Sequence, residues 1–388
     1  MQSNLLPVFL ALREVWRNKG RFLLVGLVIS LITILVLFTA GLGEGLGNGN
    51  KEYISKLDGQ LLVYQQKSDF VIPASRLPVS IITSIRRVEG VADAGLIATS
   101  NAAIILSDKP LPLKVSMLGV EPGRPGEPPA VQGRQFSGDL ANEVIIDRSV
   151  AVRSSIQLND TITIRVTQGT QDEFYTLRVV GISNGQQYSL QPAIFVPYFT
   201  WDRIRSKSEA EINGSDYTTN TIIVKLENPG ETALAKERLL AQIDNIEVAS
   251  IQQAIEAVPG YSAQQGTIST QGIFTLFIGV LVIGGFFQIQ VLQKVPQIGV
   301  LKAIGASNFV VGLAVIAQII SITVIGVGLG TAITLGFARF FPPTVPIVFN
   351  GQQTLIAIIS LLLIGPIGGL LSVRYAIKIE PLKALGLS

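Results

Sequence analysis

Four long apolar segments, one before and three after a large polar region, constrain this chain more than any other feature. They run from Phe22 to about Leu42, Gly272 to Leu292, Phe309 to Gly336 and Thr354 to Val373, and none contains Asp, Glu, Lys or Arg. Each is long enough to cross about 30 Å of hydrocarbon as a helix that rises about 1.5 Å per residue. The sequence therefore predicts four membrane-spanning helices and one large domain on one side of the membrane.

The basic residues gather at the edges of these segments. Residues 41–271 contain 20 Lys and Arg against 25 Asp and Glu, whereas the rest of the chain contains 10 against 2. Lys and Arg are enriched in short cytoplasmic loops. We therefore expect a multi-pass protein of the cell inner (plasma) membrane, with both termini cytoplasmic and the large domain outside. The basic character is explained by membrane topology, so we expect no nucleic acid partner.

The predicted fold is an α-helical membrane protein with four transmembrane helices plus a large mixed α+β extracytoplasmic domain. We expect the first segment to be retained, because it exceeds the roughly 7–15 apolar residues of a signal peptide. The predicted parts are an amphipathic cytoplasmic interfacial helix (1–20), transmembrane helix 1 (21–42), the extracytoplasmic domain (43–270), transmembrane helix 2 (271–293), a cytoplasmic loop (294–308), transmembrane helix 3 (309–337), an outer loop (338–352), transmembrane helix 4 (353–373) and a cytoplasmic tail (374–388).

The large domain shows both helical and strand patterns. A strand-rich insert at about 116–214 interrupts a unit built from about 50–115 and 215–265, and the Pro- and Gly-rich stretch Glu121–Pro129 is predicted to be a loop. The predicted helices are Leu77–Val88 and Thr232–Ile243. The predicted strands are Leu61–Tyr64, Ala102–Leu106, Lys114–Val120, Glu143–Ile146, Thr161–Val166, Phe174–Val180, Ala193–Val196, Thr221–Leu226 and Glu247–Ile251.

The absence of two residue types excludes several kinds of site. The chain contains no Cys and no His. This excludes Cys nucleophiles, Ser-His-Asp triads and zinc sites of the Cys/His type. We expect no catalytic residues, no bound metal and no enzymatic activity.

A glycine-rich run follows the first apolar segment. Residues 41–50 contain five glycines, which favours a hinge or a closely approached backbone rather than a stiff helix. No Lys-Ser or Lys-Thr follows the glycines at the spacing of a phosphate-binding loop. We therefore expect no nucleotide site there.

The loop after the second segment carries the most specific motif. Ile298, Leu301 and Ile304 are spaced to share one face of a short helix, Gly305 is placed to end it, and Ser307 or Asn308 can cap the next helix. A short amphipathic helix between two membrane helices can act as a lever for a soluble partner. An ordinary capped turn is the alternative.

This motif resembles the REIG-x-LKA-x-GAS/T signature of the FtsX-like permease family, the membrane subunits of MacB-type (type VII) ABC systems. The similarity extends to the basic stretch Leu12–Arg21, the stretch Pro78–Val91 and the closing stretch Arg374–Leu385. It covers nearly the whole chain and implies that the large domain is a MacB-like periplasmic core domain. The stretch Asn18–Gly26, followed by the start of the glycine-rich run, Gly41–Leu46, looks most like the corresponding stretches of DevC-like and heme-exporter permeases.

The resemblance implies a permease that transmits the ATP-driven motion of a separate ATPase subunit to the outer domain. The expected partners are two copies of that ATPase, which would bind ATP and Mg, a second copy of this chain or a homologous permease, membrane lipid and a membrane fusion protein. The family's Arg-Glu pair is Pro296-Gln297 here, so one charge contact to the ATPase is missing. The predicted ATPase-coupling residues are Lys294, Pro296, Gln297, Ile298, Gly299, Leu301, Lys302, Ala303, Ile304, Gly305 and Ala306.

The substrate implied by the resemblance is an amphiphile for export: a lipid, heme, peptide or drug. Glu44 and Tyr53 are the candidate substrate contacts, because a carboxylate at the outer membrane edge can hold a cationic or metal-bearing molecule. Glu44 can equally be a solvated residue beyond the bilayer. Heme is expected only as substrate, because no cofactor is expected in this chain.

Two other classes of function stay open. One is a non-transporting transmembrane transducer that regulates an envelope enzyme through the same architecture. The other is a membrane-anchored binding or enzymatic protein without an ATPase. An ATPase that binds the 294–308 loop would favour the permease or the transducer over the membrane-anchored protein without an ATPase.

Overall fold

The computed structural model describes residues 19–106, 110–207, 217–340, 345 and 347–379. The chain divides into a helical unit, Met1–Gly45 with Gln265–Ser388, and a globular unit, Leu46–Gln264. The predicted interfacial helix (1–20) and cytoplasmic tail (374–388) lie mostly outside the described residues, as does part of the predicted outer loop.

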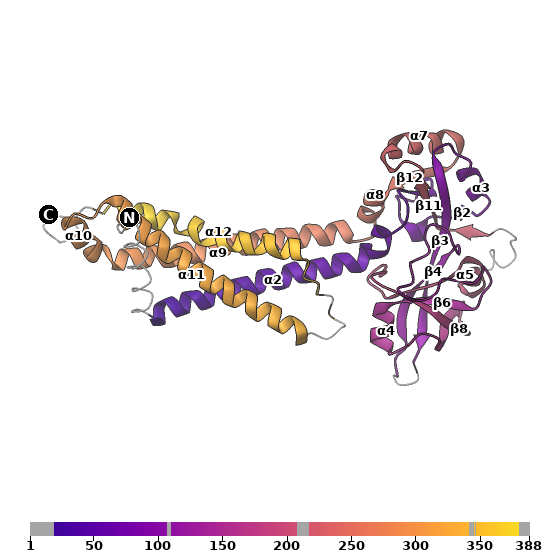
Figure 1. Cartoon of the computed structure of the whole chain (residues 1–388), viewed down its shortest axis with the longest axis horizontal. Helices are drawn as coiled ribbons and strands as arrows, with labels where there is room; N and C mark the ends of the chain where they lie inside the picture. Colours follow the sequence, from indigo (N-terminus) through magenta and orange to yellow (C-terminus); the bar gives the residue numbers. More distant parts are fainter. Residues whose placement is uncertain (1–18, 107–109, 208–216, 341–344, 346, 380–388) are drawn as a thin grey trace. The chain divides into compact units, whose positions relative to one another are not determined.

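Within the described residues, four helices are long and apolar enough to cross a membrane. They are α2 (Lys19–Ser55), α9 (Tyr261–Gln293), α11 (Asn308–Phe337) and α12 (Gly351–Ile377), drawn from indigo to yellow in Figure 1. At about 1.5 Å per residue, α2 and α9 exceed the roughly 30 Å of a hydrocarbon layer. Both helices therefore continue beyond the span that the hydropathy pattern predicts. The other described elements of this unit are the shorter helix α10 (Val295–Ala303) and the 3₁₀ turn η3 (Ala338–Phe340).

The glycine-rich run is helical, and our expectation that it is not a stiff helix was wrong in this respect. Residues 41–50 belong to α2. The other half of that expectation, a closely approached backbone, is confirmed. A Cβ on Gly41 would lie 2.9 Å from the ring of Phe349, and one on Gly43 would lie 2.8 Å from Ile268. Close tertiary packing outweighs the helix propensity of glycine, which is lower than that of Ala by about 1 kcal/mol.

The strands of the globular unit form an open sheet joined to a closed barrel. The open part has the order β12-β1-β11-β3 and is antiparallel. The barrel follows the order β3-β4-β9-β6-β8-β7, and it closes because β7 pairs with both β8 and β3. The strands are β1 (Leu61–Gln65), β3 (Val91–Ile105), β4 (Leu113–Val120), β5 (Gln132–Gly133), β6 (Glu143–Asp147), β7 (Thr161–Gln168), β8 (Gln171–Ser183), β9 (Ala193–Pro197), β11 (Thr221–Leu226) and β12 (Ile246–Ser250), with β2 (Leu77–Pro78) and β10 (Thr218–Thr219) as a separate pair.

All nine predicted strands overlap observed strands, whereas one predicted helix is much shorter. The predicted helix Leu77–Val88 is reduced to α3, because residues 77–78 pair with β10 instead. Figure 1 shows α3 and α7 beside the open sheet and α4 beside the barrel. The helices are α3 (Ile81–Ile85), α4 (Arg148–Ser154), α5 (Tyr198–Ile204), α7 (Thr232–Gln242) and α8 (Ile251–Glu256), with 3₁₀ turns η1 (Ile72–Ala74) and η2 (Pro229–Glu231).

Both faces of the open sheet are buried. Alternate residues of a strand point to opposite faces, so Leu61 and Val63 join one apolar core with α7 and the barrel interior. Leu62 and Tyr64 join a second core that also contains Tyr53 and the last turns of α2 and α8. This explains the unbroken apolar run of β1 and makes the end of α2 part of the domain core.

We expect Gly95→Ala to destabilise the globular unit, because a Cβ on Gly95 would lie 1.9 Å from the carbonyl oxygen of Pro125. Overpacking against backbone costs about 1–3 kcal/mol in the free energy of unfolding. Urea unfolding of the full chain, followed by the fluorescence of buried Trp201 in a Trp16→Phe background, measures this. Gly138→Ala is the control, since a Cβ there meets nothing within 4 Å. Equal midpoints for the two variants would contradict the packing seen here.

Candidate functional site

The loop between α9 and α11 folds as a short helix with defined ends. Pro296 lies in the first turn of α10, and Gly305 adopts a φ of +106°, which favours glycine, just after its end. Ser307 caps α11, because its hydroxyl oxygen accepts a hydrogen bond from the Val310 N–H at 3.3 Å. The predicted helix, stop and cap are all confirmed.

The predicted apolar face of α10 is divided between the inside and the outside. Ile298 is buried together with Val291 and Val311 from the neighbouring helices. Leu301 and Ile304 are instead 41% and 81% exposed. Two further exposed apolar side chains, Val300 and Phe309, were missed, because the sequence pattern assigned Phe309 to the membrane segment. We call these four exposed side chains, Val300, Leu301, Ile304 and Phe309, the α10 apolar patch.

The two lysines of this loop have different surroundings. Lys302 donates through Nζ to the carbonyl oxygens of Ile377 at 2.7 Å and Ile379 at 2.9 Å. The Nζ of Lys294 lies 5.9 Å from the ring centre of Phe22. The charge of Lys302 is therefore engaged within the chain. Of the other predicted coupling residues, Gly299 is buried, Ala306 is half-buried, and Pro296, Gln297, Ala303 and Gly305 are exposed.

Glu44 lies in α2 and is half-buried. No hydrogen bond or ion pair of Glu44 is found among the described residues. The same residues contain no group of three or more Asp or Glu that could hold a metal ion. Among the residues that the structure describes, Glu44 therefore has no partner, and a site with several ligands would need groups from outside this set.

Tyr53 is a core residue, which corrects its prediction as a substrate contact. It is 1% exposed, and its hydroxyl donates to the carbonyl oxygen of Gly126 at 3.0 Å. Its ring lies 5.3 Å from that of Phe195. The nine residues from Glu44 to Tyr53 also turn a helix by about two and a half turns, so the two side chains leave opposite faces of α2. They do not form a joint site.

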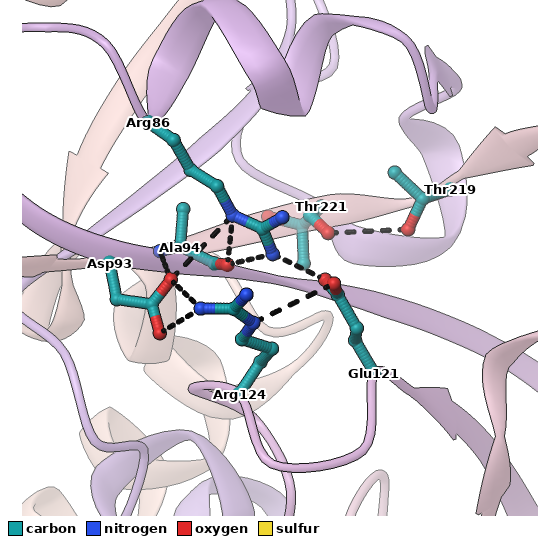
Figure 2. A network of polar contacts seen from close by, with 7 residues as sticks. All are labelled: Arg86, Asp93, Ala94, Glu121, Arg124, Thr219 and Thr221. Atoms are coloured by element: carbon teal, nitrogen blue, oxygen red, sulfur yellow. Dashed lines mark hydrogen bonds and ion pairs between the residues drawn. The ribbon is translucent and has the colours of Figure 1, made fainter. Parts of the chain in front are cut away.

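The loop that receives Tyr53 is held by a network of charges, shown in Figure 2. Arg86 donates through Nη2 to the Ala94 carbonyl oxygen and to the Glu121 carboxylate, both at 2.6 Å. Arg124 donates through Nη1 to both carboxylate oxygens of Asp93 at 3.1 Å. These four charges satisfy one another, so the network stabilises the loop rather than presenting free charges to a ligand.

A half-buried carboxylate stabilises the same loop from its other end. Glu127 accepts hydrogen bonds from the N–H groups of Gly123 at 2.7 Å and Phe136 at 3.2 Å. Burial raises the pKa of Glu127, and these two hydrogen bonds offset part of that rise. The predicted loop Glu121–Pro129 is thus an ordered support for the end of α2.

Comparison with known proteins follows this division of the chain. A family model of the MacB-like periplasmic core domain matches residues 22–242, and one of the FtsX-like permease C-terminal region matches residues 270–381. A protein assigned as a hemin transport system permease, HrtB, of Staphylococcus haemolyticus is 25% identical over 377 residues, which are 97% of this chain and 99% of that protein.

Two further similarities concern MacB proteins. The macrolide export ATP-binding/permease protein MacB of Rhodopseudomonas palustris is 23% identical over 222 residues, which are 54% of this chain and 33% of that protein. The crystal structure of the periplasmic region of MacB from Actinobacillus actinomycetemcomitans matches with a TM-score of 0.36 and 14% identity, over 52% of this chain and 93% of that one. With both family models matched in order, the chain belongs to the FtsX-like permeases with a MacB-like periplasmic core domain, the permease subunits of MacB-type ABC transporters.

Proposed function

We propose that this chain is the permease of a homodimeric exporter driven by two copies of a separate ATPase, which bind the loop around α10. The α10 apolar patch supports this proposal most directly. Large apolar side chains exposed on a loop are typical of protein or membrane interaction sites, and we assign this loop to a protein. An exposed apolar surface between two membrane helices is one that a soluble ATPase can bind and displace.

The proposed topology places α10, and with it both chain termini, in the cytoplasm. Four basic residues lie at the C-terminal ends of α9 and α12 and before the N-terminal end of α11: Lys294, Lys302, Arg374 and Lys378. The loop between α11 and α12 contains one basic residue, Arg339. Lys and Arg favour the cytoplasmic side. The globular unit then lies outside the cell membrane, where it can contact the substrate and a membrane fusion protein.

Motion of α10 has physical routes into the membrane helices. Ile298 packs with Val291 of α9, Val311 of α11 and Ala376 of α12 in one apolar cluster. Packed interiors respond as coupled bodies because their side chains fill the available space. The last turn of helix α2 contributes Tyr53 and Ile54 to the core of the globular unit. We therefore propose α2 as the helix that transmits motion to the globular unit.

We propose an amphiphilic substrate, with hemin as the first to test. The long relative HrtB is assigned to hemin transport. The candidate contact in this chain is Glu44, which would meet its copy or the substrate in a homodimer. Met117 is fully buried and the chain has no His or Cys. His, Cys and Met117 are therefore not available as ligands for the iron of hemin. Hemin would be cargo and not a resident cofactor.

We expect Ile304→Asp to release the ATPase. A charge at the centre of an apolar contact must be desolvated on binding, so affinity should fall about tenfold or more. Copurification of the ATPase from native membranes in mild detergent, followed by ATP hydrolysis, measures this. Val131→Asp places the same charge on an exposed valine of the globular unit and should change nothing. If all three proteins retain the ATPase equally, the patch is not the docking surface.

We expect Glu44→Gln to weaken hemin binding to the purified chain about tenfold, because the neutral amide no longer balances a cationic iron. Titration followed by the absorbance of bound hemin measures the affinity. Glu52→Gln is the control, since Glu52 lies on the same helix but pairs with Lys56. Unchanged binding in Glu44→Gln would remove Glu44 as a contact, and no binding by the unmodified chain would remove hemin as the substrate.

A further inference from the structure

Lys302 lies in α10 but reaches the end of another helix. Its Nζ is 2.7 Å from the carbonyl oxygen of Ile377, the last residue of α12, and 2.9 Å from that of Ile379. The last carbonyl groups of a helix have no partner within it and carry the negative end of the helix dipole. One ammonium group therefore closes the end of α12 with two charge-assisted hydrogen bonds.

The surroundings of this contact are apolar. Ile298 of α10, Val311 of α11, and Ala376 and Ile379 at the end of α12 form one buried cluster around it. A Cβ on Gly312 would lie 3.2 Å from Ile377, so α11 approaches the end of α12 closely. Carbonyl groups in such a place are costly to leave unpaired. The hydrogen bonds from Lys302 are thus the polar part of an otherwise apolar contact between α10 and the end of α12, which we call the α10–α12 joint.

We infer that Lys302 is a positioning residue that fastens α10 to the C-terminal end of α12, so that the two helices move as one body. This inference deepens the proposed function and rests on it for its consequence. Lys302 then serves the inside of the permease rather than docking the ATPase by charge. The docking surface keeps the α10 apolar patch and Lys294.

The contact between Lys302 and the end of α12 provides a route by which displacement of α10 reaches the other helices. From α12, close backbone contacts lead to α9, since a Cβ on Gly284 would lie 2.7 Å from the carbonyl oxygen of Gly368. They also lead to α11, since a Cβ on Gly365 would lie 2.0 Å from the hydroxyl oxygen of Thr323. A displacement of α10 therefore reaches α9 and α11 through α12 as well as through their direct contacts with α10.

The test measures the joint itself before it measures coupling. Because the chain has no native Cys, Gln297→Cys on α10 and Leu363→Cys on α12 accept spin labels without further changes. Both residues are exposed, and Leu363 lies about 20 Å along α12 from Ile377. Label-to-label distances are measured by pulsed electron resonance on the full chain in lipid nanodiscs. Lys302→Met keeps the length of the side chain and removes its donors, whereas Lys302→Arg keeps donors and charge.

We expect narrow and equal distance distributions for the unmodified chain, Lys302→Arg and the control Arg339→Met, which removes an exposed charge away from α10, and a broader or shifted one for Lys302→Met. With the copurified ATPase, Lys302→Met should keep ATPase binding within about twofold and lower the permease-dependent part of ATP hydrolysis about tenfold, and Lys302→Arg should restore it. If Lys302→Met does not yield folded protein, Lys302→Gln, which retains an amide donor, replaces it.

Two results would overturn the inference. One is an unchanged distance distribution in Lys302→Met. The other is a Lys302→Arg variant as impaired as Lys302→Met, because the donors would then not matter. If the ATPase fails to bind even the unmodified chain, the proposed function fails, while the distance measurement still decides whether Lys302 fastens the two helices.

Discussion

Close backbone approach between membrane helices is the constraint on which the helical unit depends. Lipid supplies little hydrophobic drive for helix association, so helices must gain contact by approaching closely at small residues. Gly326 and Gly330 let α11 reach Ile29 and Thr33 of α2, where any side chain would collide at 2.7 Å and 2.6 Å. Gly284 and Gly368 do the same for α9 and α12. Each of these contacts fixes how two helices can slide, and so which motions from α10 can pass between them.

The globular unit is built around the last turn of α2, more than 15 residues beyond Ile29 and Thr33. Its sheet is buried on both faces, and Tyr53 with Ile54 fills part of one face. The hydroxyl of Tyr53 reaches Gly126 in a loop that Arg86, Asp93, Glu121 and Arg124 hold in place. A helix end that is built into a core and braced in this way cannot shift without moving the core. The glycine-rich residues 41–50 before it are helical as well.

Much of the fold could be predicted from local patterns. Hydropathy alone located four helices, and apolar and β-branched runs bounded by turn residues located nine strands, because both signals lie along the chain itself. The stop at Gly305 and the cap at Ser307 were equally readable, since each depends on one residue's backbone preference or short side chain. The long first part of β3 was missed, because its Ala- and Gly-rich sequence has a weak strand pattern. Only pairing with distant strands makes it a strand. The helix expected at Leu77–Val88 was overestimated, because β10, far along the chain, pairs with its first residues.

The sequence by itself determined the four apolar segments, the exclusion of Cys and His chemistry, and the position of the short helix between α9 and α11, because these depend on composition and short-range spacing. Only the tertiary structure decided the roles of individual side chains. It turned Tyr53 from a candidate contact into a core residue, directed Lys302 to the end of α12, and exposed Val300 and Phe309 beside Ile304. These roles depend on which distant residues fold against each position. A Lys two turns along a helix has the same sequence signal whether its charge meets a partner protein or the carbonyl groups of a neighbouring helix.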